Sequence, residues 1–97
     1  MSLSDAQTIF IDLQGFVVDE RFKVKEIAVL KRRKELIHYI FGPPFPWSLL
    51  ESRDRSRITW LTQNHHGLRW IEGDVDYRRA WNLINQALTI NRDEVSV

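Results

Sequence analysis

The N-terminal part of the chain alternates short apolar segments with polar turns. Three segments are apolar or alternate between apolar and polar positions, and they cover residues 8–13, 22–30 and 35–41. The first is rich in β-branched residues and ends at Gly15, so it predicts a buried strand, and the alternation of the other two predicts two more strands. Polar turns at residues 19–21 and 31–34 separate them. The pattern therefore favours a three-stranded antiparallel meander.

The segment "GPPFPW" at residues 42–47 interrupts this pattern. Proline lacks an amide donor, and three prolines within four residues cannot join the interior of a sheet. We expect an extended or polyproline-like connector here. Such a stretch can dock in an aromatic groove of a partner. We favour the alternative, in which Phe45 and Trp47 pack onto the chain's own sheet.

The first helix is predicted over residues 53–63, with Ser52 as its N-cap. One face of this helix carries Arg57, Ile58 and Leu61. A loop is predicted over residues 64–73. The second helix is predicted over residues 75–90, with Asp74 as its N-cap and Asn91 as its stop.

The second predicted helix has a single apolar stripe. The stripe consists of Tyr77, Ala80, Trp81, Ile84, Ala87 and Leu88. Residues 93–97, "DEVSV", look like the start of a fourth strand. The order of three strands, two helices and a further strand predicts an α+β fold, or an α/β fold cut short.

The composition limits the classes of function. A chain of 97 residues with 43% apolar content predicts one globular domain over residues 1–97. The absence of cysteine excludes disulfides, iron–sulfur clusters and thiolate zinc sites, and it fits an intracellular location, in cytoplasm or nucleus. We see neither a membrane-spanning run nor a signal peptide, and we expect no membrane partner and no cofactor. The net charge of +1 means that any nucleic-acid surface must be local.

Several short motifs carry a family resemblance. "IFIDLQGF" resembles the first strand of the DnaQ-like (DEDD) exonucleases, "KVKEIAVL" their second strand, and "NHHGLRW" a loop that precedes a helix in that family. Parts of these segments, together with "PPFPW", are similar to arthropod exonuclease-like proteins. The resemblance implies the N-terminal half of an RNase H-like fold, that is, a truncated α+β version of it.

The departures from this family concern its chemistry. Its nuclease activity uses four carboxylates that hold two divalent metals. Asp12 matches the first of them, but Gln14 stands where the second is expected, and a neutral amide is a poor ligand for a hard cation. The third carboxylate of the family lies in or just after its fourth strand, and residues 93–97 match only the start of that strand. The resemblance therefore implies a degenerate, non-catalytic domain without a metal site.

Asp12 has two interpretations. It is either an ordinary strand acid, hydrogen-bonded to neighbours or exposed on an open sheet face, or a vestigial metal position; we favour the first. His65 and His66, with the distant His38, do not have the spacing of a metal site. We expect the adjacent histidines to point apart and to pack or bond to the backbone, with Gly67 supplying a positive φ.

Basic residues gather in the second turn and in the first helix. The nucleic-acid-binding candidates are Lys31, Arg32, Arg33, Lys34, Arg53 and Arg55. A charged hairpin tip is more often a solvated turn that also discourages edge-to-edge aggregation. We keep weak nucleic-acid binding through this turn as an alternative function.

The favoured function is a protein-interaction or self-association module. The first strand would lie at an open sheet edge, and residues 8–13 contain no Pro, Lys or Gly to protect it. We therefore expect a homodimer, and the identity of any other protein partner stays open. The interface candidates are Ile9, Ile11, Trp81, Ile84 and Leu88. A further alternative is the N-terminal part of a metal-dependent 3′–5′ exonuclease.

Overall fold

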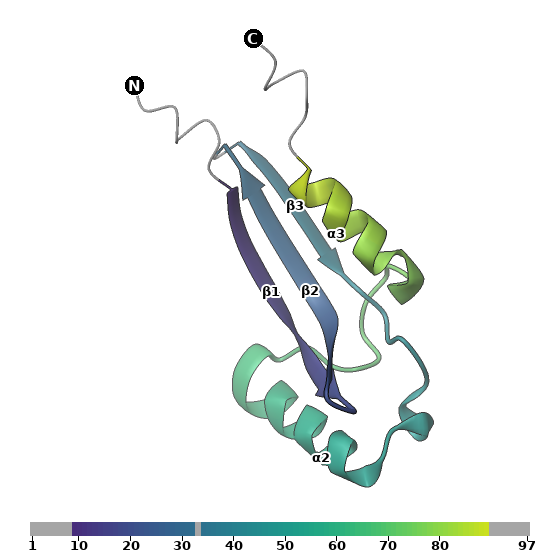
Figure 1. Cartoon of the computed structure of the whole chain (residues 1–97). Helices are drawn as coiled ribbons and strands as arrows, with labels where there is room; N and C mark the ends of the chain where they lie inside the picture. The colour runs from purple at the N-terminus through teal and green to yellow at the C-terminus, as the bar shows by residue number, and fades with distance from the viewer. Residues whose placement is uncertain (1–8, 33, 90–97) are drawn as a thin grey trace.

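The computed structural model describes residues 9–32 and 34–89 (Figure 1). Within them lies one antiparallel sheet of three strands in the order β1-β2-β3. The strands are β1 (Ile9–Val18), β2 (Arg21–Lys31) and β3 (Glu35–Ile40). Two α-helices follow in the described part, α2 (Ser52–Leu61) and α3 (Ala80–Leu88). The α+β class and the antiparallel meander are confirmed, and the predicted fourth strand lies outside the described residues.

Both hairpin turns use residues with positive φ. Val18 pairs with Arg21, so the first turn has two residues, Asp19 at φ 50° and Glu20 at φ 64°. Left-handed geometry at both positions matches the twist of the flanking strands. The second turn places Arg32 at φ 54°.

β1 differs from its prediction in length. It does not end at Gly15 but continues to Val18. Gln14 pairs with Glu26 and Gly15 pairs with Val24, which leaves one extra residue, Lys25, as a bulge in β2. A bulge adds local twist, and it lets Phe16 and Val18 turn into a different part of the core.

The two helices cover opposite faces of the sheet. On one face, Val24, Ile27 and Val29 pack against α3. On the other face, Phe16 and Val18 pack with α2. The complete first cluster is Val24, Ile27, Val29, Phe41, Ala80, Leu83, Ile84 and Ala87. The second cluster is Phe16, Val18, Leu50, Ile58 and Trp70.

The split core makes the molecule elongated. Its extents are 54 × 26 × 23 Å and its radius of gyration is 16.2 Å. A compact domain of about 100 residues has a radius of gyration of about 13 Å. The sheet is therefore longer than its two helices can cover, and part of it stays exposed (Figure 1).

The proline-rich connector packs as expected. Phe45 and Trp47 lie against the second cluster. The indole Nε1 of Trp70 donates a hydrogen bond of 3.1 Å to the carbonyl oxygen of Phe45. Trp47 then opens a single 3-10 turn, Trp47–Leu49. The connector therefore closes the α2 side of the core.

α2 begins and ends differently from its prediction. Its N-cap is Glu51, and Ser52 is its first helical residue, so the predicted cap was wrong. The buried residues are Asp54 and Ile58. Arg57, which the sequence pattern grouped on one face with Ile58 and Leu61, is exposed, whereas Ile58 is buried. α2 ends at Leu61, two residues before its predicted end at residue 63, and the chain then forms a π-helical turn, Thr62–His66, which extends into the start of the predicted loop.

α3 begins five residues after its predicted start. Val75 is extended and forms a parallel bridge with Phe41, and this pairing prevents Asp74 from capping a helix. Asp76 instead caps the 3-10 turn Tyr77–Arg79 that leads into α3, and its carboxylate accepts a hydrogen bond of 2.9 Å from the amide of Arg78. The N-cap of α3 itself is Arg79, without a side-chain hydrogen bond.

The buried face of α3 is rotated from the predicted stripe. It consists of Ala80, Leu83, Ile84 and Ala87. Trp81 and Leu88 lie on the flank of the helix, with exposed fractions of 52% and 37%. The predicted last residue of the helix and its stop at Asn91 lie outside the described residues.

Candidate functional site

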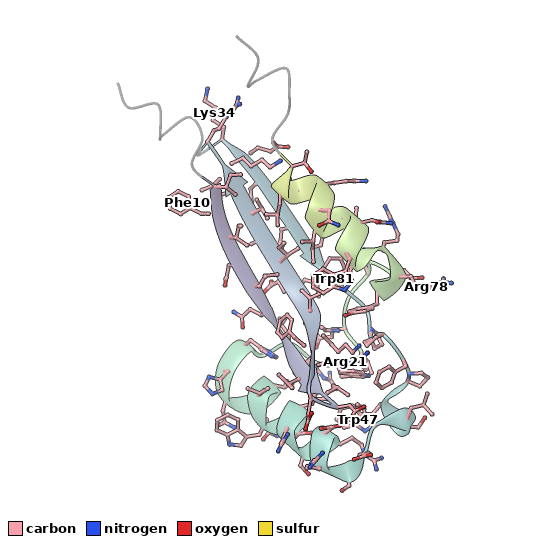
Figure 2. The ribbon with its side chains drawn as sticks, in the orientation of Figure 1. Phe10, Arg21, Lys34, Trp47, Arg78 and Trp81 are labelled. Carbon is pink, nitrogen blue, oxygen red and sulfur yellow. The ribbon has the colours of Figure 1, made fainter. Side chains whose placement is uncertain are left out.

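The free edge of β1 is the most unusual surface of the molecule. Within residues 9–32 and 34–89, β1 pairs with β2 alone, so its other edge presents unpaired backbone amides and carbonyls. Phe10, Ile11 and Leu13 are 53%, 49% and 46% exposed. Figure 2 shows Phe10 projecting from this edge, away from both helices. The prediction of a buried strand over residues 8–13 was therefore wrong for residues 10–13, because α3 packs mainly on β2 and α2 packs near the other end of β1, at Phe16 and Val18.

Cross-strand pairing explains the exposure on the α3 side. Ile11 pairs with Val29, which pairs with Ile37, so the three side chains form one row across the sheet. Paired residues share a face. Val29 is completely buried under α3, while Ile11 at the end of the row is half-exposed. Leu13 ends the next row, beside the buried Ile27.

The opposite face of the same edge is also apolar. Phe10 pairs with Leu30, which pairs with Leu36. Leu36 is 67% exposed. A shallow groove of about 180 Å³ lies here, lined by Phe10, Ile11, Asp12, Ala28, Leu30 and Leu36. β1 therefore presents apolar side chains on both faces. The apolar run was visible in the sequence, but we interpreted it as evidence of a buried strand.

Asp12 lies exposed on this groove face. Its cross-strand neighbours are Ala28 and then His38, and Gln14 pairs with Glu26. The His38 Nε2 and Glu26 Oε2 atoms are 2.6 Å apart. No group of three His, Asp or Glu residues in the described part lies close enough to hold a metal ion. Asp12 thus has the open-face position of an ordinary strand acid.

The structure separates the interface candidates. Ile11 lies at the open edge, and Ile9 is half-buried against the α3 cluster. Ile84 is only 4% exposed and belongs to the core, so it is not available to a partner, contrary to our expectation. Trp81 and Leu88 lie on α3, which packs mainly on β2. Phe10, Leu13 and Leu36 were missed.

The structure also separates the basic candidates. Lys31, Arg32 and Lys34 lie at the second hairpin turn, at one end of the sheet, and Arg33 lies outside the described residues. The Nζ atom of Lys31 donates a hydrogen bond of 3.3 Å to the carbonyl oxygen of Thr89. Arg53 and Arg55 lie on α2 at the opposite end (Figure 2). These residues cannot form one phosphate-binding surface within a single chain.

The solvent side of α2 combines arginine with an exposed aromatic ring. A groove of about 410 Å³ lies on it, lined by Ser52, Arg55, Ser56, Thr59, Trp60 and Gln63, which we call the α2 outer face. Trp60 is 55% exposed, and its ring lies 4.9 Å from that of His65. A larger groove of about 590 Å³ shares Thr59 and Gln63 and continues to Arg69 and Trp70.

The adjacent histidines point apart, as predicted. His65 lies against Trp60, whereas His66 meets the ring of Phe16 edge-on at 4.9 Å. The His66 Nδ1 atom accepts a hydrogen bond of 3.0 Å from the amide of Leu68, and Gly67 between them has φ 69°. Burial lowers the pKa of His66 from its usual 6.5.

Lys25, the extra residue of the bulge, is buried, with 2% of its surface exposed. Its Nζ atom donates hydrogen bonds to the carbonyl oxygens of Trp70 and Glu72, so it fastens the loop after the π-helical turn to the sheet. Burial lowers the pKa of Lys25 to about 8, partly offset by the negative charge of Glu72.

Comparisons with known proteins give no further guide: no family model, no curated protein and no solved structure matches the chain. Among the described helices, none is long and apolar enough to cross a membrane. The physical properties of the β1 edge and of the α2 outer face are therefore the basis for any functional assignment.

Proposed function

We propose that the chain is a non-catalytic, exonuclease-like domain that acts as a protein-interaction module, and that its binding site is the open edge of β1. The observation that supports this most is the combination of an unpaired strand edge with Phe10, Ile11 and Leu13, each about half exposed. Natural proteins usually protect such an edge with charge, proline or a covering element. Asp12 is the only charged residue among residues 9–14, so this edge is weakly protected, and an edge of this kind binds an added strand through main-chain hydrogen bonds.

The protein's own residues argue against a role for this edge in catalysis. Two-metal nucleases hold their ions with several carboxylates. Here Asp12 is exposed, Gln14 is neutral and pairs with Glu26, and Glu26 is engaged with His38. The surface around Asp12 is an apolar groove rather than a set of convergent oxygen ligands.

Sedimentation across a hundredfold dilution from micromolar concentration tests the proposal, with the wild-type chain compared with Ile11→Lys. Wild type should change its mass with concentration, and the variant should stay monomeric because a charge on the edge opposes strand addition. Ile71→Lys is the matched control, since Ile71 is 64% exposed in a loop. A wild-type chain that is monomeric throughout and captures no extended peptide at its edge would refute the proposal.

A second candidate function is weak binding of single-stranded nucleic acid by the α2 outer face. It is favoured by the exposed Trp60 beside Arg55 in a groove that no acidic residue of the described part lines. Such surfaces bind by stacking bases on an aromatic ring and by pairing phosphates with arginine. We therefore prefer this surface to the hairpin turn as the candidate nucleic-acid-binding site.

Fluorescence anisotropy with a labelled single-stranded oligonucleotide tests this second candidate. Trp60→Ala should weaken binding by about 5- to 150-fold, the equivalent of the roughly 1–3 kcal/mol that one base stack contributes. Trp81→Ala is the matched control, because Trp81 is similarly exposed but lies on α3. Neutralising Lys31 and Lys34 tests the hairpin turn. Equal affinities of the two tryptophan variants would remove the α2 outer face from consideration.

A further inference from the structure

We infer that the partner strand at the β1 edge belongs to a second copy of this chain, paired antiparallel with Ile11 on the two-fold axis. The inference rests on the proposed function of the edge and adds its occupant and its register. Closed two-fold dimers are the commonest assembly of identical chains. The pairing would join two three-stranded sheets into one continuous sheet.

The bulge limits the length of edge available. Regular pairing of β1 runs from Ile9 to Gln14, and the register shifts between Gln14 and Gly15. Beyond that point the strand twists, and Phe16 and Val18 enter the α2 core with exposed fractions of 1% and 5%. A second strand therefore pairs with the six residues before the bulge.

Symmetry and the length of the free edge together leave two candidates for the central residue, which lies opposite its own copy. A two-fold axis perpendicular to the sheet keeps each face of one chain continuous with the same face of the other. Directly opposed residues then come from the same face, so one residue lies directly opposite its own copy, with the axis between the two copies. Within the six-residue edge, the residues nearest its centre are Ile11 and Asp12.

Charge and apolar matching select Ile11. An axis through Asp12 would place two carboxylates directly opposite, which destabilises a strand pair. An axis through Ile11 places Ile11 opposite its copy and Ile9 opposite Leu13 of the partner. Each apolar side chain of the α3 face then meets another apolar side chain, and Asp12 meets Phe10 on the groove face.

This register also covers the half-exposed side chains at which two cross-strand rows of the sheet end. In one chain, Ile11 and Leu13 continue rows whose inner members, Val29 and Ile27, are buried under α3. A second copy extends these rows with its own apolar residues and then with its own buried ones. The apolar layer becomes continuous between the two α3 helices.

Cysteine cross-linking tests the register, because the natural chain contains no cysteine. Each of four full-length variants, Phe10→Cys, Ile11→Cys, Asp12→Cys and Leu13→Cys, is oxidised under mild conditions and examined on a non-reducing gel. A disulfide needs Cβ atoms about 3.5–4.5 Å apart, so only a residue on the axis links efficiently to its own copy. Ile11→Cys should give at least fivefold more dimer than each of the other three variants.

A mixing experiment keeps the test independent of any damage caused by Ile11→Cys. Ile9→Cys and Leu13→Cys should cross-link poorly alone and efficiently when mixed, since the register opposes residues 9 and 13. Preferred self-linking of Asp12→Cys or Leu13→Cys, or equal linking of all variants, would overturn the register. If the wild-type chain is monomeric by sedimentation, the inference that a second copy occupies the edge is wrong. Capture of an extended peptide at the edge would then show that the proposed function still holds, whereas no capture would refute both.

Discussion

The buried ammonium group of Lys25 donates a hydrogen bond of 2.8 Å to the carbonyl oxygen of Trp70. The two residues come from elements far apart in the sequence, a bulge in β2 and the loop that precedes α3. A second hydrogen bond, to the carbonyl oxygen of Glu72, secures the same loop. The cost of burying the charge appears in the pKa of Lys25, which falls from 10.5 to about 8.

Lys25 should make stability rise with pH in the alkaline range. Its pKa is lower in the folded chain than in the unfolded chain, so between about pH 8 and pH 10.5 the unfolded chain binds more protons. The free energy of unfolding therefore increases with pH across this window, and below pH 8 the folded chain carries the full cost of the buried charge. Urea unfolding at several pH values measures this slope.

Lys25→Met tests whether Lys25 causes the rise in the free energy of unfolding at alkaline pH. Methionine has a similar length and no charge, so the variant should lose the increase between pH 8 and pH 10.5 while leaving the carbonyl oxygens of Trp70 and Glu72 without their donor. All other groups are common to both chains, so the comparison isolates the contribution of Lys25. Parallel profiles for wild type and Lys25→Met would show that Lys25 is not the source.

His66 should make stability fall in mild acid. Burial lowers its pKa below 6.5, and its Nδ1 accepts the amide hydrogen of Leu68, a bond that protonation of Nδ1 breaks. The contribution is complete above about pH 6.5 and is lost as the pH falls through the lower folded-state value. His66→Asn retains an acceptor without a titrating ring, so its free energy of unfolding should change less between pH 7 and pH 5.

The control for this acid effect is His65→Asn. The His65 ring lies on the exposed Trp60, outside the core, and its removal leaves the Leu68 hydrogen bond in place. This variant should retain the wild-type decrease in stability between pH 7 and pH 5. The same decrease in all three chains would assign the acid sensitivity to other groups.

The sequence predicted those parts of the fold that depend on local chemistry. Alternation and turn residues predicted the meander, and the prolines predicted the connector that packs Phe45 on the core. The opposite orientation of His65 and His66 followed from their adjacency. These features depend on neighbours along the chain, and a single sequence contains that information.

The errors concern features set by contacts between distant segments. Val75 is extended because it pairs with Phe41, and that pairing delays α3 to Ala80. An apolar strand looks the same in sequence whether a helix covers it, as at Val29, or not, as at Ile11. The basic turn at residues 31–34 and the arginines of α2 lie far apart because of the length of the whole sheet, which a local sequence pattern does not reveal.

Gly15 should be irreplaceable in the bulged pair of strands. A Cβ atom at this position would lie 2.3 Å from the carbonyl oxygen of Lys23, which belongs to the rigid backbone of β2. Gly15→Ala should lower the free energy of unfolding by about 1–3 kcal/mol or more through this overpacking. Chemical denaturation gives the value directly.

Gly67→Ala separates overpacking from backbone strain. Gly67 has φ 69°, and nothing lies within 4 Å of the position of an added Cβ atom. Alanine there should cost only the left-handed backbone strain, about 1–2 kcal/mol, and Gly67→Asn should recover part of it because asparagine tolerates this region. A smaller loss for Gly15→Ala than for Gly67→Ala would contradict the assignment of Gly15 to a close backbone contact.

The chain should hydrolyse neither DNA nor RNA in the presence of magnesium or manganese. A metal-dependent nuclease needs convergent carboxylates. In the described part of the chain Asp12 is exposed, Gln14 beside it is uncharged, and no three acidic or histidine residues come together. Incubation with end-labelled single-stranded and duplex oligonucleotides, followed by gel separation of the fragments, measures the activity. Asp12→Asn is the control, since cleavage of equal rate in both chains indicates a contaminating nuclease. Metal-dependent cleavage by wild type that disappears in Asp12→Asn would show that Asp12 binds a catalytic ion, and the non-catalytic assignment would be lost.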